Sequence, residues 1–280
     1  MPDVIAAAST RISPTATVDP TASIGEGVVI EADAYVGPNC VVGDRCRLRR
    51  RSMLVANTTL GARCDVHPHA VLGGDPQDSK YDPATPGALV IGDGGVFREG
   101  VTVHRSVGDR SPTTIGAGCF FMANSHAGHN TVVGDNVTLA NGVLLAGHVR
   151  LGSRCFMGGN SGVHQFCDIG EGVMFQGVAI ATMHVLPFTI ISGVNNCSGI
   201  NVVGLRRLEG VSREDITEVR LIYKSLLREG HAVGSALERL ESRPWGPFAR
   251  RMLDFAHHVR RYEKPRVRGL AASRSQSPLP

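Results

Sequence analysis

Long apolar runs, aromatic residues and charge are all scarce in this sequence of 280 residues. Aromatic residues make up 5% and charged residues 19% of the chain. No stretch approaches the roughly 18 consecutive apolar residues of a membrane-spanning helix, so no stable membrane insertion is expected. The start, MPDVIAAASTRIS, has no basic segment before an apolar run, which argues against a secretory signal peptide.

Glycine, in contrast, is abundant. The chain contains 34 glycines without a three-residue period, which excludes a collagen helix. Because 42% of the residues are hydrophobic, most of the chain is expected to fold.

The charge is divided unevenly along the chain. Residues 1–204 carry 13 Lys and Arg against 16 Asp and Glu, whereas residues 205–280 carry 16 against 9. A basic C-terminal quarter predicts an acidic partner. A nucleic acid is not expected, because the sequence has no recognised nucleic-acid-binding motif.

Apolar residues recur at every sixth position over most of the chain, whereas an amphipathic helix would show spacings of three and four. The series runs through Ile12, Val18, Ile24, Ile30, Val36, Val42, Leu48, Leu54, Leu60, Val66 and Leu72, then Ile91, Phe97 and Val103, then Ile115, Phe121, Ala127, Val133, Leu139, Leu145, Leu151, Met157, Val163, Ile169, Phe175 and Ala181.

The neighbours of these positions define the repeat. The residue two places before is small, and the residue after is often glycine. Residues two apart point to the same side of a strand, and glycine permits the corner that follows. Three strands make a coil of 18 residues, and coils stacked at ~4.8 Å make a parallel β-helix. We predict this β-helix for residues 1–204, with loops near 73–88 and 108–114.

Cysteine usage fits the interior of such a coil. Six of the seven cysteines occupy the small inward position of the hexad: Cys40, Cys46, Cys64, Cys119, Cys155 and Cys167. We expect them to be packing residues, because inward positions on different coils rarely have disulfide geometry. Clustered zinc-ligand spacing is absent, and the pattern suits a reducing cytoplasm.

The pattern becomes helical after the hexads fade. Ser212 and Asp215 resemble a capping box with Asp in place of Glu, and apolar residues then follow at helical spacing. A small α-helical domain is predicted for residues 205–262, with further helices near 232–242 and 245–262. The Arg-, Ser- and Pro-rich residues 263–280 are expected to be a disordered tail.

Four histidines fall within 39 residues of the predicted β-helix: His126, His129, His148 and His164. The 18-residue coil places His129, Gly147 and Gln165 in one column, with His148 and His164 beside it. Three interpretations are open, namely an exposed polar face, a metal site and a general base. A zinc site built from three histidines would carry a His-x4-His pair, which is absent. A neutral imidazole can take a proton from a sugar hydroxyl, and a glycine amide can stabilise the resulting oxyanion.

The blocks around these histidines are specific. They are Gln77-Asp78-Ser79-Lys80, Asn124-Ser125-His126-Ala127-Gly128-His129, Ala146-Gly147-His148, Val163-His164-Gln165-Phe166-Cys167 and Gly204-Leu205-Arg206-Arg207. Over residues 12–262 the chain resembles the UDP-N-acetylglucosamine O-acyltransferases of lipid A biosynthesis, a family of hexapeptide-repeat acyltransferases. The resemblance implies a left-handed β-helix, a cytoplasmic homotrimer with sites between subunits, and no metal. It also implies transfer of a (3-hydroxy)acyl chain from the phosphopantetheine of acyl carrier protein to the 3-hydroxyl of UDP-N-acetylglucosamine, with no separate cofactor.

The resemblance also assigns roles. His129 would be the general base, Asp78 would orient the sugar, and the Gly147 amide would form the oxyanion hole. Asn201 and Arg207 would contact the nucleotide, and Met174 and Gly177 would lie along the acyl groove, with Gly177 limiting chain length. The remaining residues that would line the substrate site are Gln77, Lys80, His126, His148, His164 and Gln165.

Three positions depart from the family pattern. Asn130 stands where Asp is frequent, Val203 replaces a Glu, and Leu208 replaces a basic residue. An alternative function is therefore acylation of a different sugar nucleotide, or use of an acyl-coenzyme A donor. A non-enzymatic scaffold and a metal-dependent hydratase are more distant alternatives.

Overall fold

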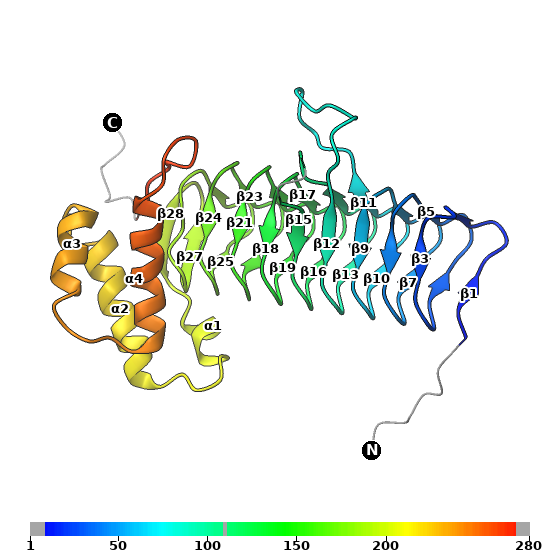
Figure 1. Ribbon diagram of the computed structural model, residues 1–280. Helices are drawn as coiled ribbons and strands as arrows, with labels where there is room; N and C mark the ends of the chain where they lie inside the picture. The colour runs from blue at the N-terminus through cyan, green and yellow to red at the C-terminus, as the bar shows by residue number, and fades with distance from the viewer. Residues whose placement is uncertain (1–8, 109–110, 273–280) are drawn as a thin grey trace, which may run out of the picture.

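The protein is described by a computed structural model, which covers residues 9–108 and 111–272. The predicted parallel β-helix with helices at its C-terminal end is confirmed (Figure 1). The residues outside the description are 1–8, two residues of the predicted loop at 108–114 (109 and 110), and 273–280.

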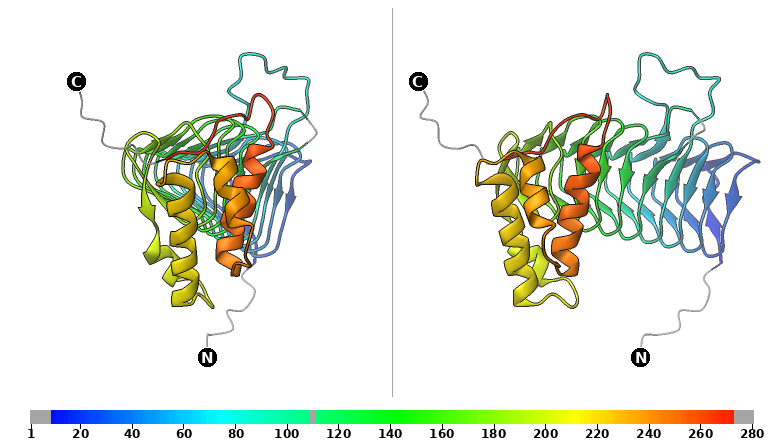
Figure 2. Two further views of the ribbon diagram at one scale, coloured as in Figure 1. Left: turned by 90° about the vertical axis from the view of Figure 1, so that its left-hand side faces the viewer. Right: turned by 60° about the vertical axis from the view of Figure 1, so that its left-hand side comes forward.

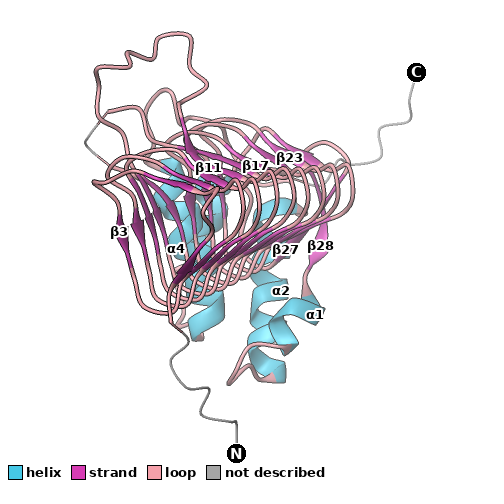
Figure 3. Ribbon diagram, turned by 90° about the vertical axis from the view of Figure 1, so that its right-hand side faces the viewer, coloured by secondary structure: helices cyan, strands magenta, loops and turns pink. Residues whose placement is uncertain are grey.

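Short strands stack into three sheets that form the faces of a triangular coil (Figure 3). The first sheet contains, in stacking order, β1 (Arg11–Ile12), β4 (Val29–Ile30), β7 (Arg47–Leu48), β10 (Asp65–Val66), β13 (Val96–Phe97), β16 (Phe120–Phe121), β19 (Thr138–Leu139), β22 (Phe156–Met157), β25 (Met174–Phe175), β27 (Thr189–Ser192) and β28 (Asn196–Ile200). The second sheet contains β2 (Thr17–Val18), β5 (Tyr35–Val36), β8 (Met53–Leu54), β11 (Val71–Gly74), β14 (Thr102–His104), β17 (His126–Ala127), β20 (Leu144–Leu145), β23 (Gly162–Val163) and β26 (Ile180–Ala181). The third sheet contains β3 (Ser23–Ile24), β6 (Val41–Val42), β9 (Thr58–Leu60), β12 (Leu89–Ile91), β15 (Thr113–Ile115), β18 (Val132–Val133), β21 (Arg150–Leu151) and β24 (Asp168–Ile169).

The strands are short because each coil turns a corner after every sixth residue. Within a strand the first residue faces outward and the second fills the interior, as Leu144 at 57% and Leu145 at 0% exposure illustrate. The cysteines are all free and buried, as predicted for packing residues. Neighbouring strands pair in parallel, except that β28 returns antiparallel to β27.

Four helices follow the last coil: α1 (Val202–Arg206), α2 (Arg213–Leu227), α3 (Val233–Leu240) and α4 (Pro247–Arg260). The predicted capping box is present, because the side chains of Ser212 and Asp215 each accept a hydrogen bond from the other's backbone amide. Helices α2, α3 and α4 pack beside one another at the C-terminal end of the β-helix (Figure 2). Among the described residues, no helix combines the length and apolarity needed to traverse a membrane.

Two segments outside the regular coils matter for the site. The predicted loop at 73–88 leaves the body between β11 and β12 and projects from it (Figure 1). The prediction that residues 263–280 form a disordered tail is corrected in part. Residues 263–272 are ordered and run back along the β-helix. There Leu270 forms a β-bridge with His184, and the Ala271 amide donates to the His184 carbonyl. Backbone pairing and burial of Ala271 outweigh the polar composition that suggested disorder.

Candidate active site

The corner between the second and third sheets brings the predicted column together. The His148 amide donates to the His129 carbonyl at 2.9 Å, and the Phe166 amide donates to the Gly147 carbonyl at 3.4 Å. Since β17, β20 and β23 pair in register, His129, Gly147 and Gln165 stack one above another. The column predicted from the 18-residue coil is therefore confirmed.

A hollow of about 510 Å³ lies over this column. Six of the predicted site residues line it: Gln77, His126, His129, Gly147, His164 and Gln165. The apolar side chains of Leu144, Val163 and Ile180 complete its wall, so the hollow offers both polar groups and an apolar surface.

His129 is 8% exposed, and its orientation is fixed by Asn130. The Asn130 Oδ1 accepts the Val107 amide at 3.0 Å, and its Nδ2 donates to the Val107 carbonyl at 3.5 Å. These two backbone contacts determine which end of the amide is the oxygen. That oxygen lies 2.9 Å from His129 Nδ1, so Nδ1 must carry a proton. In neutral His129, Nε2 is consequently the unprotonated nitrogen, which is the atom a general base requires.

Gly147 lies directly against this nitrogen. A Cβ at position 147 would come within 2.7 Å of His129 Nε2, so a side chain there would displace the ring. At equivalent corners of the third sheet, an aspartate of the next coil accepts the amide, as Asp44 does from Glu26 and Asp135 from Ala117. The Gly147 amide has no such acceptor among the residues that the structure describes. A donor is thus left for a ligand beside the base.

His148 and Phe166 buttress the base. Both have left-handed backbone angles, φ +61° and +65°, as do the corresponding corner residues of many other coils, for example Asn130 and Arg154. The His148 ring stacks on Phe166 at 4.8 Å between centroids and meets His129 edge-on at 5.0 Å. Burial, followed by the charges of His129 and Arg266, lowers the pKa of His148, whereas nearby Asp78 acts in the opposite direction.

A fifth histidine, His104, belongs to the cluster and was missed by the sequence analysis. Its ring lies 5.2 Å from that of His126, whose Nδ1 hydrogen bonds to Thr102 Oγ1 at 2.8 Å. Burial and the neighbouring histidines lower the pKa of His126 to about 4. His104 Nδ1 donates to the Asp75 carbonyl, while its Nε2 is buried without a partner among the described residues. The sequence did contain a pointer to it, because His104 directly follows the hexad residue Val103. The loops at 73–88 and 108–114 interrupt the 18-residue spacing, so His104 could not be aligned with the other histidines by spacing alone.

The projecting loop is anchored beside this cluster. Buried Arg105 donates to the Gly73 carbonyl and to the Asp75 carboxylate at the base of the loop. Predicted site residues Gln77 and Lys80 are exposed on the loop, and the Asp78 carboxylate accepts the Lys80 amide at 2.9 Å. Gln77 therefore reaches the hollow directly, and Asp78 acts on the cluster through its charge.

Comparisons with known proteins match both parts of the chain. The family described as UDP-N-acetylglucosamine O-acyltransferase, domain 2, matches residues 185–266, and bacterial transferase hexapeptide repeats match 21–54 and 112–147. The acyl-[acyl-carrier-protein]–UDP-N-acetylglucosamine O-acyltransferase of Burkholderia orbicola is 41% identical over 234 residues, covering 82% of this chain and 88% of the relative. The enzyme of that name from Agrobacterium fabrum is 40% identical over 233 residues, covering 82% and 85%. The crystal structure of UDP-N-acetylglucosamine O-acyltransferase from Moraxella catarrhalis superposes with a TM-score of 0.84 at 34% identity, covering 93% and 99%.

The chain belongs to the UDP-N-acetylglucosamine O-acyltransferase family. The resemblance predicted from the histidine blocks is thereby confirmed.

Two residues that the family resemblance assigns to the nucleotide lie elsewhere in this acyltransferase. Asn201 caps α1 by accepting the Gly204 amide at 2.9 Å, and its Nδ2 donates to the Gly172 carbonyl at 2.9 Å. Arg207 is exposed at the end of α1. Figure 1 shows α1 on the side of the molecule opposite the projecting loop, so a single chain does not bring these residues to the hollow.

The two residues assigned to the acyl groove lie on the coil that follows. Met174 is half-buried on β25, and Gly177 is exposed at the next corner. A Cβ at Gly177 would meet only the Gly159 carbonyl oxygen, at 3.6 Å, which is an ordinary contact. A side chain at position 177 would therefore fit and project outward.

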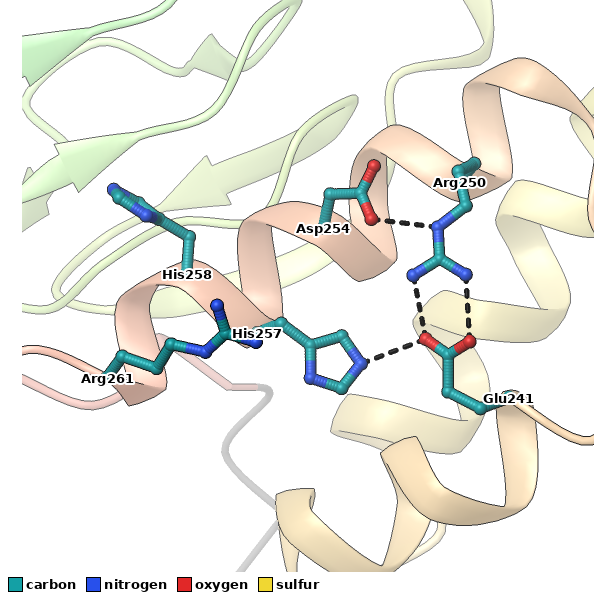
Figure 4. Close-up of a pocket in the computed structure, with 6 residues that line it drawn as sticks. All are labelled: Glu241, Arg250, Asp254, His257, His258 and Arg261. Carbon is teal, nitrogen blue, oxygen red and sulfur yellow. Dashed lines mark hydrogen bonds and ion pairs between the residues drawn. The ribbon is translucent and has the colours of Figure 1, made fainter.

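A second hollow lies between α3 and α4, lined by Glu241, Arg250, Asp254, His257, His258 and Arg261 (Figure 4). Its charges neutralise one another. Arg250 donates to the carboxylates of Glu241 and Asp254 at 2.7–2.8 Å, and this guanidinium lowers the pKa of Glu241 to about 2. Within the described residues no group of three metal-ligating side chains has the geometry of a metal site.

Proposed function

We propose that the chain transfers a (3-hydroxy)acyl group from acyl carrier protein to the 3-hydroxyl of UDP-N-acetylglucosamine, the first step of lipid A biosynthesis. Support comes from its relatives, which bear that name at about 40% identity, and from the site itself. The observation that carries the proposal is the placement of His129 Nε2 against Gly147, with its tautomer fixed by Asn130.

The step follows from these three residues. His129 Nε2 takes the proton of the sugar hydroxyl while the hydroxyl oxygen attacks the thioester carbonyl carbon. The carbonyl oxygen becomes an oxyanion, which the Gly147 amide stabilises. The tetrahedral intermediate then expels the thiolate, and the imidazolium of His129 returns the proton to give the free thiol. The only carrier group required is the phosphopantetheine arm of the donor.

Asn130 gives this base a particular character. A carboxylate next to Nδ1 would stabilise the imidazolium by its charge, whereas the Asn130 amide supplies only a neutral acceptor. The base is therefore oriented without added charge stabilisation. The Val107 backbone, which holds both ends of the amide, provides the rigidity instead.

Polar residues around the hollow are proposed to hold the acceptor. Gln77, Asp78 and Lys80 approach from the loop, and His164 and Gln165 are exposed on the coil above Gly147. Neutral His126 and His148 can each donate one hydrogen bond and accept another. Met174 and Gly177 would border the acyl chain. A bulkier residue at position 177 would therefore reduce the length of the acyl chain that the groove accepts.

We further propose a homotrimer. The nucleotide residues Asn201 and Arg207 lie away from the hollow of their own chain, and pockets form readily between bodies. Leu144 at the hollow and Phe156 on the first sheet are exposed by 57% and 43%, as expected of a surface that a second copy covers. The proposed location is the cytoplasm, where acyl carrier protein is available.

The basic helical end is proposed to dock the acidic carrier protein. Arg213, Arg220 and Lys224 are exposed on α2 at helical spacing. Arg228, which continues this spacing, is engaged with the body of the protein, because it donates to Tyr223 Oη at 2.9 Å and to the Ser198 carbonyl at 3.1 Å. The proposed docking face therefore centres on Arg220 and Lys224.

One observation favours a different acceptor. Val203 is 61% exposed on α1 between Asn201 and Arg207, where the family pattern has a glutamate. A related sugar nucleotide with fewer polar contacts at this point is the alternative acceptor.

The deciding experiment incubates the purified protein with hydroxyacyl carrier proteins and a panel of UDP-sugars, and identifies products by mass spectrometry. We expect O-acylated UDP-N-acetylglucosamine, and His129→Ala should form it about 100-fold or more slowly. Preference for another UDP-sugar would select the alternative acceptor. The absence of any acylated sugar nucleotide would refute both proposals.

A further inference from the structure

The residues after α4 form a strap, defined here as 262–272, that crosses the last coils of the β-helix. Its far end is fixed by the β-bridges of Leu270 to His184 and of Ala272 to Asn196. His184 is fully buried, and its Nε2 hydrogen bonds to the Arg266 carbonyl at 2.8 Å. The strap is thus attached to the last coils of the β-helix, which follow the coils of the active site.

A buried carboxylate holds the middle of the strap. Asp168 lies on the outer face of β24, yet it is only 5% exposed because the strap covers it. Arg266 Nη1 donates to Asp168 Oδ1 at 2.8 Å, and Tyr262 donates to Oδ2. Burial and this hydrogen bond raise the pKa of Tyr262 to about 12, so the phenol keeps its proton. Because a buried charge must be paired, Asp168 fixes the position of the Arg266 guanidinium.

The other arm of the same guanidinium reaches the active-site corner. Arg266 Nη2 donates to the His148 carbonyl at 3.0 Å, and its Cζ lies 6.0 Å from the centroid of the Phe166 ring. His148 and Phe166 are the two residues with left-handed backbone angles whose rings stack beside His129. The strap therefore contacts the corner that carries His148 and Phe166, next to the base.

We propose that Arg266 is a positioning residue: by linking Asp168 to the His148 carbonyl it holds the 147–148 corner and the His148–Phe166 stack, and through them the His129 base. This inference rests on the proposed function. A corner so supported keeps the Gly147 amide and the His129 ring in register with each other, and small displacements of reacting groups are costly to turnover.

The test replaces Arg266 with Met, which keeps much of the length but removes every donor, and with Lys, which can reach one partner but not both. Arg261→Met is the matched control, because Arg261 lies close by in sequence but faces the hollow between α3 and α4 (Figure 4). We expect Arg266→Met to lower kcat by about tenfold or more, with KM for both substrates changed less than about threefold, and Arg266→Lys to be intermediate. The control should resemble the unaltered protein.

A second readout does not depend on activity. With ¹³Cε1-labelled histidine, the His148 signal, identified by its loss in His148→Gln, should shift in Arg266→Met and stay in place in Arg261→Met. Leu270→Ala, which loosens the strap without removing these hydrogen bonds, controls for general destabilisation and should cost less kcat at equal loss of Tm. An unmoved His148 signal, or a kcat within twofold of the unaltered protein, overturns the proposal. If the unaltered protein makes no acylated sugar nucleotide while His148 still shifts in Arg266→Met, the proposed function fails and the structural link stands.

Discussion

Replacing Gly147 with Ala tests the geometry on which the proposed mechanism depends. A single methyl group is added, at a corner whose φ is not in the left-handed region. That methyl would lie 2.7 Å from His129 Nε2 and 2.9 Å from Cε1. Ordinary contacts begin near 3.4 Å, so the His129 ring must move by several tenths of an ångström or more.

The expected cost can be worked from this displacement. A misplacement of about 1 Å at a reacting group can lower a rate about 100-fold, or about 2.7 kcal/mol in activation free energy. The Asn130 hydrogen bond opposes rotation of the ring about its Nδ1, so the displacement is not easily absorbed. Stability should change little, because two effects oppose each other. The lower entropy of the unfolded chain stabilises the variant by about 0.4–1 kcal/mol, and displacement of the His129 ring destabilises it.

The assay compares kcat, KM and Tm of Gly147→Ala with those of two controls. Gly162→Ala adds a methyl in the same hollow at 3.7 Å from its nearest neighbour, and Gly199→Ala adds one where nothing lies within 4 Å. We expect a loss near 100-fold in kcat for Gly147→Ala, under tenfold for Gly162→Ala, and none for Gly199→Ala. A Gly147→Ala protein with kcat within threefold of the unaltered enzyme would refute the reasoning, as would an equal loss in Gly162→Ala.

Further predictions follow from the same residues. His129→Ala should cut kcat by about 100-fold or more with Tm nearly unchanged, and near-normal turnover would mean another base. Since the pKa of His126 is lowered to about 4, that ring stays neutral above about pH 5, and His126→Gln should leave the acidic limb of kcat/KM in place; a shifted limb would contradict this. Asn130→Asp adds a charge that favours the imidazolium, so the acidic limb should move to higher pH, and an unmoved limb would exclude direct coupling. Arg220→Glu with Lys224→Glu should weaken the apparent affinity for the carrier protein and flatten its salt dependence, with kcat at saturation retained; an unchanged salt slope would place docking elsewhere.

The fold and the core of the site could be predicted because both follow from one repeat. A six-residue period fixes which side chain enters the interior, and an 18-residue coil fixes which residues stack. That is why the sequence alone aligns His129, Gly147 and Gln165, and why they meet in the structure. The prediction needed only local geometry, applied again at each coil.

The parts that could not be predicted depend on contacts outside the repeat. His104 was missed because the insertions around it interrupt the period, and its partner is a backbone carbonyl in one of those insertions. Arg266 lies in a segment whose composition suggests disorder, yet it pairs with Asp168, 98 residues earlier. No spacing in the sequence reveals that pair, because it forms only where the strap happens to cross β24.

Asn130 shows why a departure from a family pattern needs a structure to interpret it. From the sequence, losing an aspartate removes a charge and suggests a weaker base. The structure shows that the amide keeps the geometric part of the role, since its oxygen still accepts from Nδ1 while the Val107 backbone holds it on both sides. An aspartate in the same place would accept the Val107 amide but would set a carboxylate oxygen against the Val107 carbonyl, an unfavourable pairing of two acceptors. Asn130 is therefore compatible with both Val107 contacts, whereas an aspartate is compatible with only one. The shift of the acidic limb in Asn130→Asp measures the effect of the charge that Asn130 lacks.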